Sequence, residues 1–322
     1  MFEDKFKKDL LSNKENIYVA FSGGADSVAL LHYCSVLKNS LLQNRSIYAI
    51  HINHQISSQS KEWSNFCEDF CNEHDINFIS KTISIPKDYS SLESAARKKR
   101  YDAFRNIIKN DGALVLAHHL DDRVETLLYR MFRGTGIDGL ISFRETVEYK
   151  GLRILRPLIA IQKTEILEYV QNHSLIFTED ESNKDLSFDR NYIRHEILPK
   201  ILHRWPSANL KIADLASFAE ENNQLKENYL QDLANHCLLN NQLSISQVNN
   251  LDRNSRDEII RFWIKKSGYA LPNKNQLYEI IKVFFQSNPT KNSYVQWSRA
   301  DENEKGCRIV CNRKMLILED IL

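Results

Sequence analysis

The first half of the chain alternates short apolar runs with amphipathic helical patterns, and this alternation constrains the fold more than any other feature. The apolar runs predict strands at residues 17–21, 46–52, 78–85 and 113–117. Helical spacing follows each run, and Ser90-x-x-Glu93 is a capping box that begins one of these helices. The alternation indicates an α/β domain, a parallel twisted sheet with helices on both faces. In such a sheet, ligands bind at the carboxyl ends of the strands.

After Pro157 the pattern changes to helices separated by polar loops. Helical periodicity covers residues 163–173, 191–202 (with Pro199 a predicted kink), 208–239, 256–266 and 276–285. Short strands are expected near 294–297 and 308–318. Trp205-Pro206-Ser207 is the strongest boundary signal. We therefore expect the α/β domain over residues 1–205 and a smaller, mostly helical domain over 206–322, which agrees with two domains for 322 residues.

The composition excludes several classes of protein. No apolar run is long enough for a transmembrane helix, and residues 1–11 lack the apolar core of a signal peptide, so we expect a cytoplasmic protein with no membrane partner. The six cysteines lack the C-x2-C spacing of zinc and redox motifs, so we expect each of them to be a small buried side chain. With 43 basic and 42 acidic residues, overall charge does not indicate a nucleic-acid partner, although basic residues cluster at 97–105 and 190–204.

A loop of small residues, Ser22-Gly23-Gly24-Ala25-Asp26-Ser27, joins the first predicted strand to the following helix. Backbone N–H groups and the helix dipole at such a position bind phosphate, and two glycines allow a polyphosphate to approach the backbone. Asp26 would repel a bare phosphate, so its presence predicts a bound Mg²⁺. The loop is neither a Walker A motif nor G-x-G-x-x-G, which disfavours a dinucleotide-binding domain.

Further motifs follow this loop in a fixed order. They are Glu93-Ser94-Ala95-Ala96-Arg97 with Arg100-Tyr101, residues 116–126 (LAHHLDDRVET), Arg133-Gly134-Thr135-Gly136, Arg156-Pro157-Leu158, Glu179-Asp180-Glu181-Ser182-Asn183 and residues 190–199 (RNYIRHEILP). Together with the loop, they resemble the tRNA(Ile)-lysidine synthetases of the PP-loop (N-type) ATP pyrophosphatase family. The resemblance extends motif by motif over the first 200 residues, and the remainder is similar to the family's helical domain only loosely.

The resemblance implies a ligase that cleaves ATP to AMP and pyrophosphate and uses Mg²⁺. Its substrates would be free lysine and tRNA(Ile) with a CAU anticodon. The wobble cytidine would be adenylated and then joined to lysine at C2, which changes decoding from AUG to AUA. The resemblance leaves open whether the protein forms a homodimer. Some longer family members have a further C-terminal β-rich domain, for which this chain leaves little room.

The expected site residues combine the resemblance with their positions. ATP is expected to contact the loop residues Ser22, Gly23, Gly24, Ala25, Asp26 and Ser27 and also His51 and Asn53. Asp26 and Asp122 would hold Mg²⁺, and Asp122 and Glu125, which share a helix face, would bind lysine and accept its proton. Arg97 and Arg190 are expected near the nucleotide, and Arg100, Arg194, Lys200 and Arg204 near the tRNA. These assignments make Asp26, Asp122, Glu125, Arg97 and Arg190 the expected catalytic residues.

Several alternatives stay open. The pair Asp122 and Glu125 is also typical of a helix N-terminus, where acidic residues complement the dipole. His118 and His119 fit ligand contacts and packed residues equally well, and His51 and His54 fit a structural or adenine-shelf role better than a zinc site. At the level of function, the rivals are a tRNA 2-thiocytidine synthetase, disfavoured by the lack of C-x2-C, and a non-catalytic tRNA-binding relative, disfavoured by the acidic residues.

Overall fold

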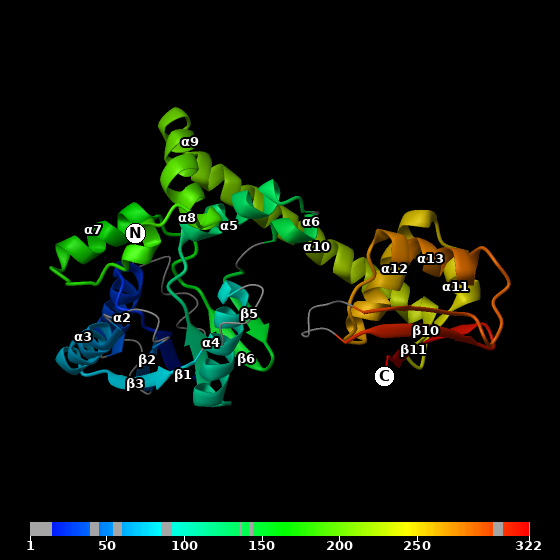
Figure 1. Ribbon diagram of the computed structural model, residues 1–322, viewed down its shortest axis with the longest axis horizontal. Coiled ribbons are helices and arrows are strands. Elements are labelled where there is room, and N and C mark those ends of the chain that lie inside the picture. Colours follow the sequence, from blue (N-terminus) through cyan, green and yellow to red (C-terminus); the bar gives the residue numbers. More distant parts are fainter. Residues whose placement is uncertain are drawn as a thin grey trace. The chain divides into compact units, whose positions relative to one another are not determined.

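The structure is a computed structural model and describes residues 15–38, 45–53, 60–84, 92–135, 137–141, 144–298 and 305–321 (Figure 1). It contains two compact units, Met1–Ala219 and Glu220–Leu322. The units meet inside one helix, α10 (Ala208–Cys237), whereas the boundary expected from the sequence lies just before that helix. A domain boundary at residue 205 therefore stays a prediction.

The first unit is built on a six-stranded sheet, which confirms the predicted α/β fold. The strand order is β3 (Asn77–Thr82), β2 (Ile47–Asn53), β1 (Asn16–Ala20), β4 (Gly112–Val115), β6 (Leu152–Leu155) and β5 (Thr146–Tyr149). All neighbours are parallel except β5 and β6, which form an antiparallel hairpin at one edge. The hairpin turn is Lys150-Gly151, with φ of 50° and 78°, where glycine adopts the left-handed conformation without a steric cost.

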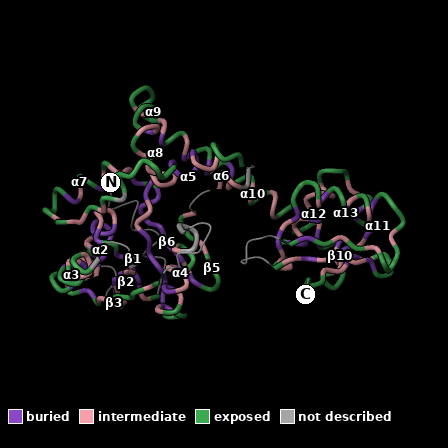
Figure 2. Tube along the Cα trace, viewed as in Figure 1, coloured by how far each residue is buried: buried purple, intermediate pink, exposed green. Residues whose placement is uncertain are grey.

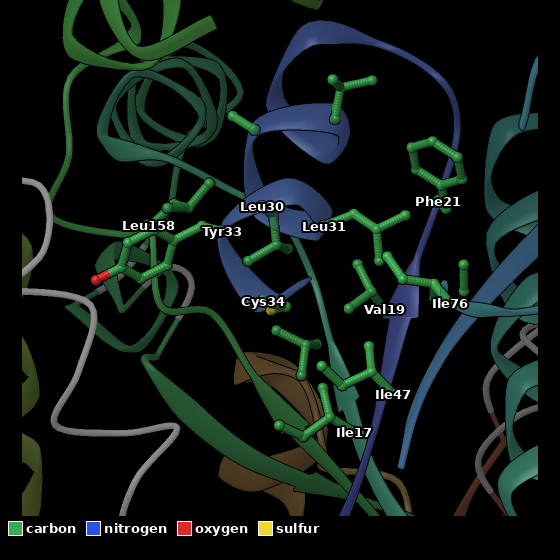
Figure 3. Close-up of a cluster of buried hydrophobic side chains, with 14 of the residues drawn as sticks. Ile17, Val19, Phe21, Leu30, Leu31, Tyr33, Cys34, Ile47, Ile76 and Leu158 are labelled. Carbon is green, nitrogen blue, oxygen red and sulfur yellow. The ribbon is translucent and has the colours of Figure 1, made fainter. Parts of the chain in front are cut away.

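The two faces of the sheet have separate cores because successive strand residues point to opposite sides. Ile17 and Val19 of β1 belong to a core with buried residues of α2 (Ala25–Lys38), α3 (Ser60–Glu73) and α7 (Lys163–Asn172). Figure 3 shows them beside Leu30, Leu31 and Cys34 of α2. Tyr18 packs on the other face, against Tyr101 and Phe104 of α4 (Leu92–Ile108). Buried residues accordingly follow the central strands (Figure 2). Burial on both faces explains why these strands are continuous apolar runs.

The remaining helices of this unit lie beyond the carboxyl ends of the strands. They are α5 (Leu120–Phe132), α6 (Ile137–Leu140), η1 (Glu181–Lys184), α8 (Asp189–Tyr192), η2 (Ile193–Ile197) and α9 (Leu198–Arg204). The predicted helix over 191–202 is interrupted by η2, a π-helical segment in which the Leu198 N–H donates to the Ile193 carbonyl. Pro199 has no N–H to donate, which accounts for the irregular turn before it. Val124 and Leu128 of α5 pack against Ile193 and Leu198.

The second unit has helices and a sheet of its own. Its helices are α11 (Ile245–Asn249), α12 (Arg253–Lys266) and α13 (Lys274–Phe285). Its antiparallel sheet has the order β7 (Leu238–Leu239), β8 (Gln242–Ser244), β11 (Met315–Asp320), β10 (Cys307–Asn312) and β9 (Tyr294–Trp297). The predicted helices and terminal strands are present, and the single apolar run at 308–318 folds as two strands of a hairpin. Trp263 is fully buried and donates to the Asn241 carbonyl at 2.9 Å.

The cysteines are free and buried, as expected from their spacing. Burial raises the pKa of Cys34, Cys67, Cys71 and Cys307 to about 12, so these thiols are protonated at neutral pH. They behave as small apolar side chains within the two cores. Among the described residues, none of the helices combines the length and the apolar character needed to cross a membrane.

Candidate active site

The glycine-rich loop lies at the carboxyl end of β1, where the sequence placed a phosphate site. Gly23 has a φ of 85°, and a Cβ there would lie 2.9 Å from Thr178 Oγ1. The Gly23 carbonyl accepts a hydrogen bond from the Thr178 N–H at 2.9 Å. Ser27 Oγ donates to the Gly24 carbonyl at 2.9 Å and lies 3.1 Å from Ser22 Oγ. The loop is thus held by its own hydroxyls, and position 23 requires glycine.

Asp26 lies in the first turn of α2 and contacts two cationic groups from other elements. Its Oδ1 lies 2.5 Å from Lys163 Nζ, at the start of α7. Its Oδ2 lies 3.7 Å from His119 Nε2, directly before α5. The expected proximity of Asp26 and Asp122 is present, because Asp122 Oδ2 lies 3.5 Å from the same nitrogen of His119.

His119 is buried among three carboxylates. Its Nδ1 lies 3.6 Å from Asp121 Oδ2, and its Nε2 faces both Asp26 and Asp122. Burial alone would lower the pKa of His119, but the negative charges of Asp121, Asp122 and Asp26 outweigh it and raise the pKa. The imidazole thus lies between the start of α5 and Asp26 of α2.

Glu125 forms a buried ion pair with Arg194. The carboxylate accepts from Arg194 Nε at 2.6 Å and from Nη2 at 2.8 Å, and Nη2 also contacts Asp122 Oδ1 at 3.2 Å. Glu125 is only 1% exposed, so burial raises its pKa while Arg194 opposes that shift. The pair predicted to bind lysine is thus occupied by an arginine that was predicted to contact tRNA, and both roles stay predictions.

His118 faces a different environment from its neighbour. Its Nδ1 accepts a hydrogen bond from Arg156 Nε at 3.1 Å. Burial, together with the charges of Arg156, Arg97, Arg100 and Arg190, lowers the pKa of His118 well below its usual value. The two histidines, which the sequence could not separate, therefore have pKa values shifted in opposite directions: arginines and burial lower that of His118, and carboxylates raise that of His119.

A group of arginines, which we call the arginine wall, lies at this position. Four of them act on His118, and Arg130 is close to two of these four: the group is Arg97, Arg100, Arg130, Arg156 and Arg190. Arg190 donates to Thr126 Oγ1 at 3.0 Å, and Arg97 lies over the Tyr101 ring. Arg130 donates to the Gly139 and Ile141 carbonyls, and burial together with Arg97 and Arg190 lowers its pKa. Arginine side chains gathered in this way repel one another, and such groups are typical of sites that bind phosphate. Arg130 and Arg156 were absent from the sequence prediction, although Arg156 belongs to a quoted motif.

His51 and Asn53 lie at the carboxyl end of β2. His51 is buried, its Nδ1 lies 3.0 Å from the Phe21 carbonyl, and burial lowers its pKa. The neutral ring thus connects the ends of β1 and β2, next to the loop. Asn53 accepts a backbone hydrogen bond from Ile83. Contact of either residue with ATP stays a prediction, and His54 lies outside the described residues.

The residues expected at the tRNA lie on three helical segments, and one of them, Arg194 on η2, forms the ion pair with Glu125 described above. Arg100 is on α4 and belongs to the arginine wall. Lys200 and Arg204 are exposed on α9, where Lys200 pairs with Glu196 at 3.0 Å and Arg204 lies near the Trp205 ring. An exposed ion pair of this kind contributes little to stability, so Lys200 can exchange its partner readily.

The donor set at His119 is suited to magnesium, although no group of three or more metal-ligating side chains is assembled among the described residues. Asp26 and Asp122 each have one carboxylate oxygen within 3.7 Å of His119 Nε2, so the two carboxylates lie close together. Mg²⁺ prefers one or two carboxylates together with phosphate and water oxygens. Asp26 and Asp122 therefore fit as its protein ligands.

Comparison with protein families gives two matches along the chain. A model described as a PP-loop domain matches residues 1–201. A model described as the TilS substrate binding domain matches residues 243–315. The two matches fall mainly on the first and second compact units, respectively.

Comparison with individual proteins gives relatives over most of the chain. The tRNA(Ile)-lysidine synthase of Legionella pneumophila (strain Paris) is 34% identical over 293 residues, which cover 90% of this chain and 66% of the relative. The tRNA(Ile)-lysidine synthase of Buchnera aphidicola subsp. Baizongia pistaciae is 37% identical over 289 residues, which cover 86% of this chain and 64% of the relative. The chain thus spans about two thirds of the length of these relatives.

A solved structure shares the fold at low sequence identity. The U34-tRNA thiolase NcsA from Methanococcus maripaludis, determined with its [4Fe-4S] cluster, aligns with a TM-score of 0.56 and 16% identity. The alignment covers 68% of this chain and 76% of that chain. At this identity the likeness concerns the fold alone.

Proposed function

The chain belongs to the PP-loop family and is related to curated tRNA(Ile)-lysidine synthases, and from this premise we propose that it attaches lysine to the wobble cytidine of tRNA(Ile). The target is C2 of the cytidine in a CAU anticodon, and the product, lysidine, changes decoding from AUG to AUA. The observation that best supports the proposal is similarity to these synthases over 90% of the chain. The carboxylate cluster directly beside the phosphate loop agrees with it.

In the proposed reaction, the glycine-rich loop binds the pyrophosphate part of ATP. Backbone N–H groups at the start of α2 and the hydroxyls of Ser22 and Ser27 are suited to phosphate oxygens. Arg97 and Arg190 supply positive charge near the α-phosphate from the arginine wall. Magnesium neutralises charge on the phosphates when bound, with Asp26 and Asp122 as the residues proposed to hold it.

Two bond exchanges follow. The cytidine O2 attacks the α-phosphorus of ATP, and the bond to pyrophosphate breaks, which leaves an adenylated cytidine. The ε-amine of lysine then attacks C2, and the C2–O bond to AMP breaks. The ε-ammonium must lose a proton before it attacks, and a carboxylate of this site is the proposed acceptor.

Asp122 and Glu125 are the proposed residues for binding the lysine ε-ammonium. In the structure, Arg194 occupies both carboxylates. Lysine binding in this proposal therefore requires Arg194 to release them. The Arg194 side chain is 37% exposed and can turn toward solvent or an RNA phosphate, which agrees with the tRNA role expected for it.

We propose that the tRNA presents its anticodon loop with the cytidine unstacked, since enzymes that modify a base need access to its edge. Arg100, Lys200 and Arg204 are the proposed phosphate contacts in the first unit. The match of residues 243–315 to a substrate-binding domain supports a role for the second unit in binding the tRNA. Because tRNA and free lysine are the substrates of the proposed reaction, we propose that it takes place in the cytoplasm.

The test is pyrophosphate release by the purified chain with ATP, Mg²⁺, lysine and an isoleucine tRNA bearing CAU, each omitted in turn. The proposal expects release that requires this tRNA, with labelled lysine retained on the RNA. Release without lysine incorporation would contradict it and favour another PP-loop modification. The absence of release with tRNA binding retained would favour a non-catalytic relative.

A further inference from the structure

Lys163 contacts the phosphate loop region although the sequence prediction gave it no role. Its Nζ lies 2.5 Å from Asp26 Oδ1, and the two side chains are 36% and 30% exposed. This ion pair therefore lies at the accessible edge of the site, within reach of a bound molecule.

The backbone of Lys163 is fixed independently of Asp26. Lys163 is the first residue of α7, and its N–H donates to Asp121 Oδ2 at 2.8 Å. The Leu120 N–H donates to the Ile161 carbonyl at 2.9 Å, which joins the preceding turn to the start of α5. The backbone is thus attached to α5, while the long side chain reaches across to α2. The ammonium group can change partners without a change in the backbone.

The position of Asp26 explains why a mobile cation is needed there. Asp26 is the second residue of α2, directly after the loop whose N–H groups face a phosphate. An uncompensated carboxylate at this point would repel a polyphosphate, and two like charges about 4 Å apart interact by several kcal/mol at the dielectric of a protein surface. Lys163 neutralises this carboxylate, and an ammonium with three donors can bind a phosphate oxygen equally well.

We propose that Lys163 is an ATP-binding residue whose ammonium group alternates between Asp26 and the β- and γ-phosphates. When Asp26 binds Mg²⁺ with the nucleotide, Lys163 leaves the carboxylate and donates to the phosphates. The proposal rests on the proposed function to the extent that the loop binds ATP. It differs from a purely structural ion pair because Mg²⁺ and Lys163 compete for one carboxylate.

The competition predicts opposite effects of one substitution. Lys163→Gln removes a phosphate donor, so the affinity for a nucleotide decreases. The same substitution removes the nearer of the two groups that contact Asp26 and leaves its Oδ1 available, so the affinity for Mg²⁺ alone increases. A residue that merely stabilised the fold would change both affinities in the same direction or neither.

Calorimetric titration of the full chain with the non-hydrolysable analogue AMPCPP and Mg²⁺ tests the first effect. Lys163→Gln is expected to weaken analogue binding roughly 10- to 100-fold, the range for loss of a charged hydrogen bond. Lys163→Arg, which keeps the charge, should recover most of the affinity. Lys38→Gln is the matched control, because it removes another lysine–aspartate pair, with a lysine 32% exposed, at the far end of α2. The control should bind the analogue like the wild type.

Titration with Mg²⁺ alone, followed by thermal denaturation, tests the second effect. The rise in Tm on adding Mg²⁺ should be larger for Lys163→Gln than for the wild type. An analogue affinity within twofold of the wild type, or an unchanged response to Mg²⁺, would overturn the inference. Failure of the wild type to bind the analogue would overturn the proposed function as well, whereas a wild type that binds it without ligating lysine would overturn the proposed function alone.

Discussion

Replacement of Arg194 by methionine should destabilise the first unit, because it leaves Glu125 buried without a counter-charge. Breaking a buried ion pair costs about 3–5 kcal/mol, and the 37% exposure of the Arg194 side chain favours the lower limit. We therefore expect a loss of about 3 kcal/mol in the free energy of unfolding. For a unit of this size the loss corresponds to a decrease in Tm of roughly 6–12 °C.

The double variant Arg194→Met with Glu125→Gln separates the charge from the packing. Because glutamine is neutral, the double variant should lose only about 1 kcal/mol, which is about 2 kcal/mol less than the loss expected for Arg194→Met alone. Arg133→Met, at an exposed site at the end of α5, is the control and should change stability by less than about 0.5 kcal/mol.

The loss should also depend on pH in a defined direction. Burial raises the pKa of Glu125, and without Arg194 only the charge of Arg190 opposes that shift. A carboxyl group whose pKa is raised by folding stabilises the folded state at low pH and loses that effect as the pH rises through the raised value. Thermal denaturation of wild type and Arg194→Met should therefore differ more at pH 8 than at pH 5. A difference in Tm below 2 °C at pH 8, or one that increases toward pH 5, would refute this reasoning.

Three further predictions concern the loop, the metal and the thiols. Asp26→Ala should abolish AMP formation while tRNA affinity, measured by filter binding, stays within about threefold; surviving turnover would exclude Asp26 as a magnesium ligand. Gly23→Ala should lose about 1–2 kcal/mol in chemical denaturation, because of its positive φ and the contact with Thr178; unchanged stability would contradict the required glycine. In the native chain, the six buried thiols should react with a disulfide reagent far more slowly than in denaturant, and rapid native labelling would contradict their burial.

The parts of the fold that were predicted correctly depend on local patterns. The strands β1, β2 and β4 are apolar runs because both faces of the sheet are covered, and their order with the helices determines the fold class. The hairpin of β5 and β6 was missed because each strand has four residues and β5 alternates exposed and half-buried residues. The sheet of the second unit was underestimated because its pairs join β8 to β11, which are distant in sequence.

The sequence predicted the site residues that lie close together within one motif. It did not predict contacts between residues from distant segments. Asp26 and Lys163 are 137 positions apart, and no local pattern connects them. Similarly, the difference between His118 and His119 depends on Arg156 and Asp26, which tertiary structure brings to opposite sides of one dipeptide. The sequence left the roles of His118 and His119 open, and their tertiary contacts shift their pKa values in opposite directions.

The helix α10 has a consequence for the way the chain folds. Its 30 residues, about 45 Å of helix, belong to both compact units. Starting a helix is the unfavourable step and extending it is favourable, so the two units share one nucleation event instead of needing two. Partial unfolding of one half of the chain is therefore expected to affect the other half. The other half should then unfold less cooperatively and be less protected from hydrogen exchange.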